Sequence, residues 1–156
     1  MKRMEKLRKT IFIDAPRAHV WDVMLTDQTY RDWTTAFTPG SHFVGDWSQG
    51  SKILFVGPSP DGAGEMGMVS RIAENRPHEF ISIEHLGIYR NGVEDTESPE
   101  AKKWAPAYEN YTFAEKNGGT ELTVEMDIDE AEQQTFATMW DAALARLKAI
   151  AEADRG

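Results

Sequence analysis

The sequence predicts an α+β fold in which an antiparallel sheet and one long C-terminal helix bury each other's apolar faces. Residues 129–153 carry an apolar stripe with the period of a helix, whereas residues 41–128 consist of short strand-like runs separated by turn residues. Two short helices are expected after a first strand at residues 7–13. At 156 residues the chain can bury a substantial core, so we expect a single domain over residues 1–156.

The first strand is followed by two short amphipathic helices. Leu7, Ile11 and Ile13 share one side of the strand, as the apolar residues of a half-buried strand should. Pro16 suits the first position of the next helix, where a missing N–H leaves no bond unmade. The second helix is expected to end at Phe37, just before a Pro-Gly pair.

The middle of the chain predicts an antiparallel meander. Clusters of Gly, Pro, Asn and Ser separate apolar runs of strand length. The predicted strands span residues 43–47, 52–56, 66–73, 80–86, 108–115 and 121–128. With the first strand they make a sheet of six or seven strands, and the last two form the clearest hairpin, across the turn at residues 117–119.

Alternation within these strands predicts which side chains face the helix. Arg71 should face solvent, so Met68 falls on the inward side of its strand. In the next strand, Ile83 is apolar and inward, and by the same alternation His85 and Tyr89 lie on its side.

The longest irregular stretch is expected at residues 90–106, which are acidic and contain Trp104. A loop of this length inside a compact domain is more often functional or mobile than a simple connection. We therefore expect this segment to contribute to function.

The terminal helix is predicted over residues 129–153. Asp129 can accept a hydrogen bond from the backbone N–H of Glu132, whose carboxylate can reach back in a capping box. The apolar stripe consists of Phe136, Met139, Trp140, Ala143, Leu144, Leu147 and Ile150. At about 1.5 Å per residue the helix is roughly 36 Å long, enough to cover a whole sheet.

Composition excludes several classes of function. A net charge of −9 argues against binding to the phosphate backbone of nucleic acids. The absence of cysteine excludes disulfides and thiolate metal sites. No apolar run approaches the ~20 residues of a membrane span, and no signal-peptide pattern is found at the N-terminus. We therefore expect a soluble, cytoplasmic protein that binds neither nucleic acid nor membrane.

Motifs for cofactors and metals are also missing from the sequence. Residues 62–67 match a G-x-G-x-x-G pattern, but turn residues precede the pattern and a strand follows it, whereas the dinucleotide motif opens a helix. His19 and Asp22 share a helical face, but two ligands do not make a zinc site. We expect no metal and no cofactor.

An ordered set of motifs resembles the SRPBCC superfamily, also called START-like or Bet v 1-like. The motifs are Asp14-Ala15-Pro16 and Val20-Trp21 after the first strand, then Trp33, Gly50, Gly67 and Gly118-Gly119-Thr120. Within the superfamily, the chain is most similar to the proteins like the activator of Hsp90 ATPase homologue 1 (AHSA1). The resemblance implies a helix-grip fold, in which a strongly bent antiparallel sheet wraps the C-terminal helix and leaves a cavity between them.

The functions of this superfamily run from hydrophobic-ligand carriers through polyketide cyclases and aromatases to co-chaperones of the stress response, so three hypotheses follow. The first is a binding protein for a small hydrophobic or aromatic molecule, without catalysis. Its predicted ligand-binding residues are Met24, Trp33, Phe37, Met68, His85, Tyr89, Tyr111, Met139 and Trp140. The competing interpretation is that these side chains simply fill the core.

The other two hypotheses are a co-chaperone for an Hsp90-type chaperone and an enzyme of the cyclase or aromatase kind. The co-chaperone would use Trp104, in its acidic segment, to anchor the partner. The enzyme would use His85 as an acid or base. The competing interpretation of His85 is a core histidine that is hydrogen-bonded to Tyr or to backbone. The residues favour binding without catalysis.

Overall fold

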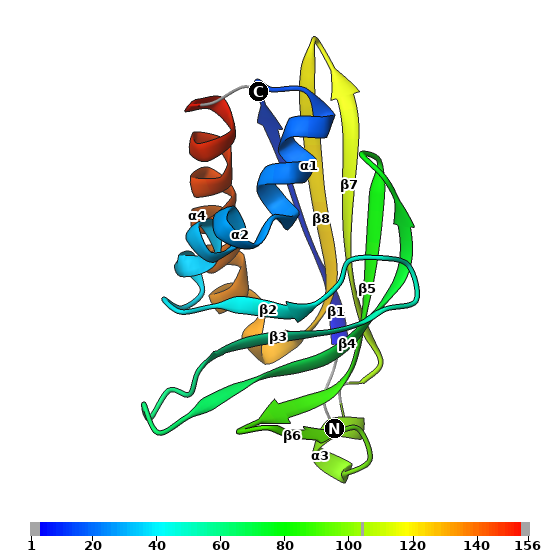
Figure 1. The fold of residues 1–156 in the computed structure, drawn as a ribbon, viewed down its shortest axis with the longest axis vertical. Coiled ribbons are helices and arrows are strands. Elements are labelled where there is room, and N and C mark those ends of the chain that lie inside the picture. The colour runs from blue at the N-terminus through cyan, green and yellow to red at the C-terminus, as the bar shows by residue number, and fades with distance from the viewer. Residues whose placement is uncertain (1–3, 104, 154–156) are drawn as a thin grey trace.

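The computed structural model describes residues 4–103 and 105–153 and confirms the α+β fold. One curved antiparallel sheet holds the main helices on its concave side (Figure 1). The strands are β1 (Met4–Ile13), β2 (His42–Gly45), β3 (Lys52–Pro58), β4 (Glu65–Arg76), β5 (Phe80–Arg90), β6 (Val93–Asp95), β7 (Ala107–Lys116) and β8 (Gly119–Asp129). The helices are α1 (Arg17–Leu25), α2 (Asp27–Trp33), α3 (Pro99–Lys102) and α4 (Gln133–Ala153), with 3₁₀ turns η1 (Thr34–Ala36) and η2 (Glu130–Glu132).

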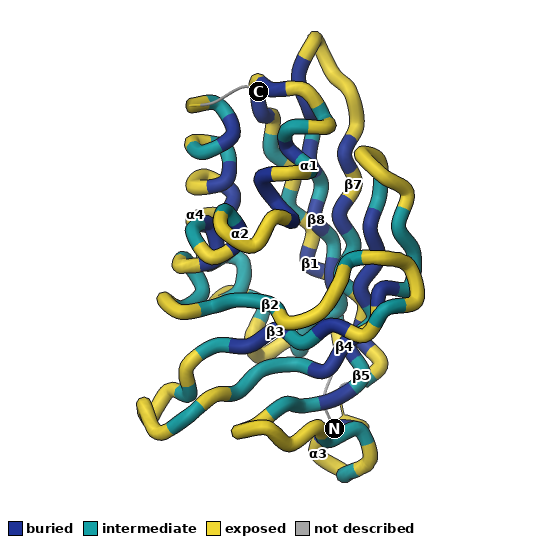
Figure 2. The backbone as a smooth tube through the Cα atoms, viewed as in Figure 1, coloured by how far each residue is buried: buried dark blue, intermediate teal, exposed yellow. Residues whose placement is uncertain are grey.

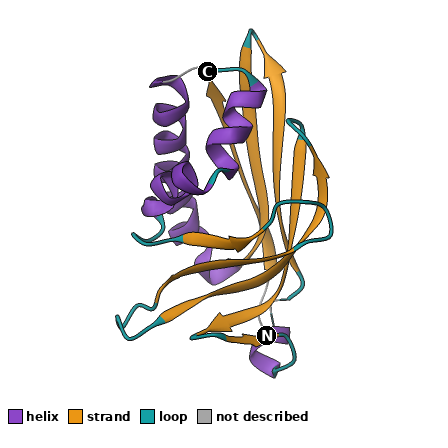
Figure 3. Ribbon diagram, in the orientation of Figure 1, coloured by secondary structure: helices purple, strands orange, loops and turns teal. Residues whose placement is uncertain are grey.

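The strand order across the sheet is β1-β8-β7-β5-β4-β3-β2, with β6 paired to β5. Register shifts interrupt the β4–β5 ladder at Val69/Ser70 and at Ile72/Glu74. Such bulges bend a strand and increase its twist. The end of the sheet that contains β2 and β3 therefore runs across the direction of β7 and β8 (Figure 3).

The first register shift also reverses the side-chain alternation in β5. Ser70 pairs with His85 but Met68 pairs with Ile88, so β5 has one extra residue between the two pairs. Opposed residues of an antiparallel pair point to the same face. Ile88, and not Tyr89, therefore follows His85 on the face shared with Met68, and the prediction that Tyr89 lies on the inward side is wrong.

Helix α4 lies along the concave face and buries the predicted stripe. Its fully buried positions are Trp140, Ala143, Leu144, Leu147 and Ala151. The helix packs against β1, α1, α2 and η1, and its buried residues face the sheet (Figure 2). None of the helices in the described ranges is both long and apolar enough to cross a membrane.

The start of α4 differs from the predicted capping box. The Asp129 carboxylate accepts a hydrogen bond from the backbone N–H of Ala131, at 3.1 Å, and not from that of Glu132. The reason is the 3₁₀ turn η2, because an Asp side chain readily bonds the backbone two residues on.

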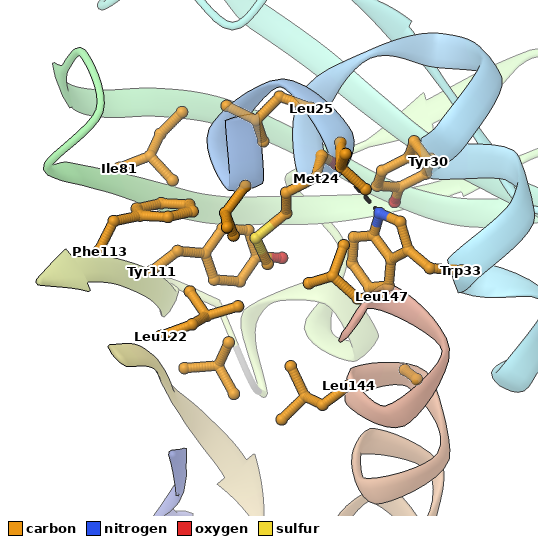
Figure 4. Close-up of a cluster of buried hydrophobic side chains, with 14 of the residues drawn as sticks. Met24, Leu25, Tyr30, Trp33, Ile81, Tyr111, Phe113, Leu122, Leu144 and Leu147 are labelled. Atoms are coloured by element: carbon orange, nitrogen blue, oxygen red, sulfur yellow. Dashed lines mark hydrogen bonds between the residues drawn. The ribbon is translucent and has the colours of Figure 1, made fainter. Parts of the chain in front are cut away.

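The two N-terminal helices are shorter than predicted. Pro16 is the N-cap of α1, and not its first helical residue. Helix α2 ends at Trp33, and η1 continues the chain toward Phe37. The Trp33 indole N–H donates to the backbone oxygen of Met24 at 3.1 Å, which joins α2 to the end of α1, and Leu147 of α4 lies next to the Trp33 ring (Figure 4).

The segment at residues 90–106 is more ordered than predicted. It contains the short strand β6, which pairs with β5, and the single-turn helix α3. The Ser98 side chain caps α3 by accepting from the N–H of Ala101 at 3.1 Å. These elements explain why the sheet has eight strands within the described ranges, and not six or seven. Trp104 lies outside the described residues.

The predicted β7–β8 hairpin is confirmed. Its turn residues Asn117 and Gly118 have φ angles of 50° and 80°. Two consecutive positive φ angles define the turn type that matches the twist of a hairpin, and Asn-Gly is its preferred pair.

Replacing Leu147 by Ala should lower the free energy of unfolding by about 2–5 kcal/mol, because the side chain is fully buried and its removal leaves a cavity. The control is Arg146→Ala, which removes an exposed ion pair with Asp32 and should cost less than about 1 kcal/mol. Urea unfolding followed by circular dichroism measures both. Equal losses would contradict the packing of α4 on the sheet.

Candidate functional site

A pocket of about 590 Å³ lies between the β3–β4 hairpin, the segment from α2 to β2, and the first turns of α4. Strands β7 and β8 supply its floor. Its wall consists of Tyr30, Trp33, Thr34, Phe37, Thr38, Ser41, His42, Phe55, Val56, Gly57, Pro58, Ser59, Pro60, Met66, Gly67, Met68, Glu109, Tyr111, Met126, Phe136 and Trp140. This wall is mainly apolar, with aromatic rings from helices and strands.

Trp140 of α4 is the centre of the aromatic wall. Its ring lies 5.0 Å from Phe37, 5.9 Å from Trp33 and 6.1 Å from Tyr111, measured between ring centroids. The Trp140 indole N–H donates to the sulfur of Met126 at 3.2 Å. Rings held in edge-on and tilted contacts of this kind are fixed by their neighbours. The wall is therefore largely preformed.

One acidic side chain, Glu109, forms part of the floor. Glu109 on β7 is opposite Ile83 on β5, and Tyr111 is opposite Ile81. Since opposed residues share a face, the Glu109 carboxylate lies on the inward side of the sheet with these isoleucines. Its side chain is only 16% exposed.

A row of hydrogen bonds across three strands holds the Glu109 carboxylate in place. His85 Nε2 lies 3.0 Å from Glu109 Oε1, and His85 Nδ1 lies 2.7 Å from the Ser70 hydroxyl. In the neutral tautomer that fits both contacts, Nε2 donates to Glu109 and Nδ1 accepts from Ser70. The Tyr111 hydroxyl donates to Glu109 Oε2. Both carboxylate oxygens thus have donors from the protein.

The two buried tyrosines beside Glu109 stay protonated. Burial raises the pKa of Tyr30, and the negative charge of Glu109 raises it further. Burial also raises the pKa of Tyr111 well above its ordinary value, with added contributions from Glu109 and Tyr30. Both side chains therefore present neutral hydroxyl groups to the pocket and its floor at neutral pH.

The nine residues predicted to bind ligand divide into two groups. Five of them lie on the pocket wall, namely Trp33, Phe37, Met68, Tyr111 and Trp140. The other four, Met24, His85, Tyr89 and Met139, do not belong to the wall among the described residues.

Each of these four is displaced for a structural reason. Met24 is 0% exposed in the core beneath Trp33. His85 is separated from the pocket by Glu109, whose carboxylate it bonds. Tyr89 comes after the extra residue of β5, which reverses the alternation and turns Tyr89 to the other face of the sheet. Met139 is half-buried and precedes Trp140, and consecutive residues of a helix project about 100° apart.

Glu109 was not predicted from the sequence, although a signal was present. Glu109, Tyr111 and Phe113 are two residues apart and therefore share one face of their strand. A carboxylate on the same face as two aromatic residues is unusual, because charged groups are seldom buried without partners. An acidic residue on an otherwise aromatic strand face could therefore have identified Glu109 as part of the site.

The described residues in and around the pocket offer few groups for metal binding or acid–base catalysis. Within the described ranges, no group of three or more His, Asp or Glu side chains could hold a metal ion. Both ring nitrogens of His85 are engaged, by Ser70 and Glu109. The arrangement suits reversible binding, in which an apolar body contacts the rings and a polar group meets Glu109.

The sequence matches the model of a family described as activator of Hsp90 ATPase homolog 1-like protein over residues 14–152. No match was found among curated proteins. The family match therefore covers α1 to β8 and nearly all of α4, including every element that forms the pocket.

Several solved structures share the fold. A protein from Rhizobium leguminosarum is 13% identical with a TM-score of 0.75, and the match covers 99% of this chain and 98% of that chain. An AHSA1-like protein from Aeromonas hydrophila is 16% identical with a TM-score of 0.68, covering 96% and 93%. DynU16, a protein in the dynemicin biosynthetic locus, is 15% identical with a TM-score of 0.65, covering 94% of this chain and 47% of that chain.

Replacing Ser70 by Ala should lower the free energy of unfolding by about 1–3 kcal/mol, because it leaves the buried Nδ1 of His85 without its hydroxyl partner. The matched control is Ser48→Ala, whose hydroxyl bonds Asp46 at the surface and whose loss should cost less than about 0.5 kcal/mol. Denaturant unfolding compares the two variants. A loss at Ser70 no larger than at Ser48 would show that the row of hydrogen bonds contributes nothing to stability.

Stability should fall as pH rises above about 10, the ordinary pKa of tyrosine. The pKa values of Tyr30 and Tyr111 are raised in the folded protein, so both groups ionise more easily in the unfolded chain. Their contribution is complete below the unfolded pKa and is lost as pH rises from there toward the folded values. Unfolding at a series of pH values measures the decline, which should be weaker in Tyr111→Phe. An identical decline in that variant would contradict the assignment.

Proposed function

Because the chain belongs to the family of activator of Hsp90 ATPase homolog 1-like proteins, we propose that it binds a small hydrophobic or aromatic molecule in its pocket, without catalysis. The observation that carries the proposal is the pocket of about 590 Å³ whose wall is built mainly from aromatic and apolar side chains. Ligand pockets of proteins are commonly 300–1,000 Å³ and combine an apolar lining with a few polar groups.

The composition of the wall favours one kind of ligand. Trp33, Phe37 and Trp140 form one cluster of rings in the wall, in which the half-buried Phe37 is the member most accessible to a flat molecule. Burying apolar surface in such a site is worth about 25 cal/mol per Å² before the costs of association. Thr34, Thr38 and Ser41 place hydroxyl groups in the same wall. A ligand with an aromatic body and a small polar end fits this pattern.

Catalysis by His85 is less well supported than binding. His85 does not belong to the described wall, and its two ring nitrogens bond Ser70 and Glu109. A general acid or base must come within hydrogen-bond reach of the substrate. The likeness to DynU16 in the dynemicin biosynthetic locus concerns the fold, and fold alone does not transfer a reaction.

The co-chaperone alternative rests on the family description and on the acidic segment around Trp104. Trp104 itself lies outside the described residues. The binding proposal rests on described side chains and is therefore the one we put first.

N-phenyl-1-naphthylamine, a neutral aromatic probe, should bind one molecule per chain with a rise in its fluorescence. Phe37→Ala should weaken this binding roughly tenfold, because the ring contacts Trp33 and Trp140 at the wall. Phe12→Ala is the matched control, because Phe12 is exposed on β1 and lies outside the wall.

The titration follows probe fluorescence, with the melting temperature as a second measure, since a ligand of the folded state raises it. Absence of binding by the wild-type protein, or equal weakening in both Phe variants, would count against the pocket as the binding site.

A further inference from the structure

We propose that Glu109 makes the pocket selective for ligands whose polar end carries a positive charge and donates hydrogen bonds, that is, for aromatic molecules with a protonated amine. This inference rests on the proposed function and specifies the class of ligand. It is carried by the position of one carboxylate on the floor of an aromatic pocket.

Glu109 is the acidic group of the described wall, and His42 is its titratable base. The described wall contains no other acidic residue and no Lys or Arg. The imidazole of His85 and the hydroxyl of Tyr111 form hydrogen bonds with the carboxylate. Tyr30 is close enough for the charge of Glu109 to raise its pKa. A negative charge in a poorly hydrated site attracts a cation more strongly than it would in water.

The carboxylate keeps capacity for a further donor. An ionised carboxylate has about four lone-pair sites. One site on each oxygen accepts from the protein, Oε1 from His85 and Oε2 from Tyr111. Because Glu109 also forms part of the pocket surface, an N–H donor of a bound ligand can reach the remaining sites. Charge-assisted hydrogen bonds of this kind are about twice as strong as neutral ones.

The rings around Glu109 favour the same ligands. Tyr111 bonds Glu109, and the ring of Trp140 lies 6.1 Å from that of Tyr111. The faces of Trp, Tyr and Phe rings carry partial negative charge and attract cations within about 6 Å. An ammonium group beside Glu109 would bind the carboxylate next to Tyr111, whose hydroxyl bonds that carboxylate and whose ring contacts Trp140. A carboxylate ligand in the same place would meet a like charge with no Lys or Arg of the described wall to offset it.

The protonation state of His85 decides whether the pocket binds an amine more tightly than a neutral alcohol. With neutral His85, the negative charge of Glu109 is uncompensated and the amine binds best. With protonated His85, the His85–Glu109 pair is neutral as a whole, and an alcohol would bind about as well as an amine. The Ser70 hydroxyl beside Nδ1 can donate to a neutral ring or accept from a protonated one, so the measured ranking of amine against alcohol reports which state His85 adopts.

Three probes that share one ring system test the inference, namely 2-naphthylmethylamine, 2-naphthylmethanol and 2-naphthoic acid. Isothermal titration calorimetry with the wild-type protein at neutral pH should rank the amine first and the acid last, with at least a tenfold difference between them. This ranking uses the native chain and does not depend on any variant folding.

Glu109→Gln keeps the size of the side chain and removes its charge. This variant should bind the amine about tenfold more weakly, bind the alcohol with nearly unchanged affinity and bind the acid more tightly. The matched control is Glu125→Gln, which makes the same charge change on β8 outside the described wall, beside Arg8, and should alter none of the three affinities. Melting curves establish that both variants are folded.

The outcomes separate this inference from the proposed function. Equal affinities for amine and alcohol, tighter binding of the acid, or an amine affinity that Glu109→Gln does not change would each overturn the selectivity. In all three cases the binding of aromatic molecules stands. If none of the three probes binds while N-phenyl-1-naphthylamine does, the selectivity is again overturned and the binding function is kept. If that neutral probe also fails to bind, the proposed function is overturned with it.

Discussion

A straight helix cannot follow a bent sheet along its whole length, and this mismatch determines where the pocket lies. In the C-terminal half of α4, the small side chains of Ala143 and Ala151 and the intervening Leu147 are completely buried, so helix and sheet touch closely there. In the N-terminal half, Phe136 and Met139 are only half-buried. Phe136 and Trp140 belong to the pocket wall. The helix thus closes one end of the concave face and leaves space at the other.

The bend that produces this space also arranges the polar groups beneath it. Ser70, His85 and Glu109 come from the adjacent strands β4, β5 and β7 and form one hydrogen-bonded row across the sheet. The extra residue of β5 comes directly after His85, so the irregularity and the row are next to each other. Bulges often re-aim side chains beside functional sites. A buried polar row is stable only when its members are satisfied, and here each member has a partner.

The structural neighbours place this arrangement in context. The three chains compared above, which are 13–16% identical to this one, share its fold over at least 94% of its length. A sheet wrapped around a helix is therefore compatible with very different side chains. Since function depends on the groups that line a site, the proposed class of ligand rests on residues such as Glu109 and Trp140 and not on the fold.

Local patterns decided most of the architecture. The helical stripe of α4, the Asn-Gly turn between β7 and β8, and the alternation in β8 depend on neighbours in the chain, and the structure confirms all three. The inward position of Tyr89 was predicted wrongly because a bulge interrupts the alternation, and no local rule located that bulge. The cap of α4 differed because η2 precedes the helix.

The amino-acid sequence by itself determined the α+β class, the order of the elements and five of the pocket residues, because hydrophobic periodicity and turn chemistry act over a few residues. Only the tertiary structure decided that Glu109 lies on the floor, that His85 is behind it and that Met24 belongs to the core. These positions depend on strand register and on the gap between a straight helix and a bent sheet, and both arise from contacts between segments that are distant in the chain.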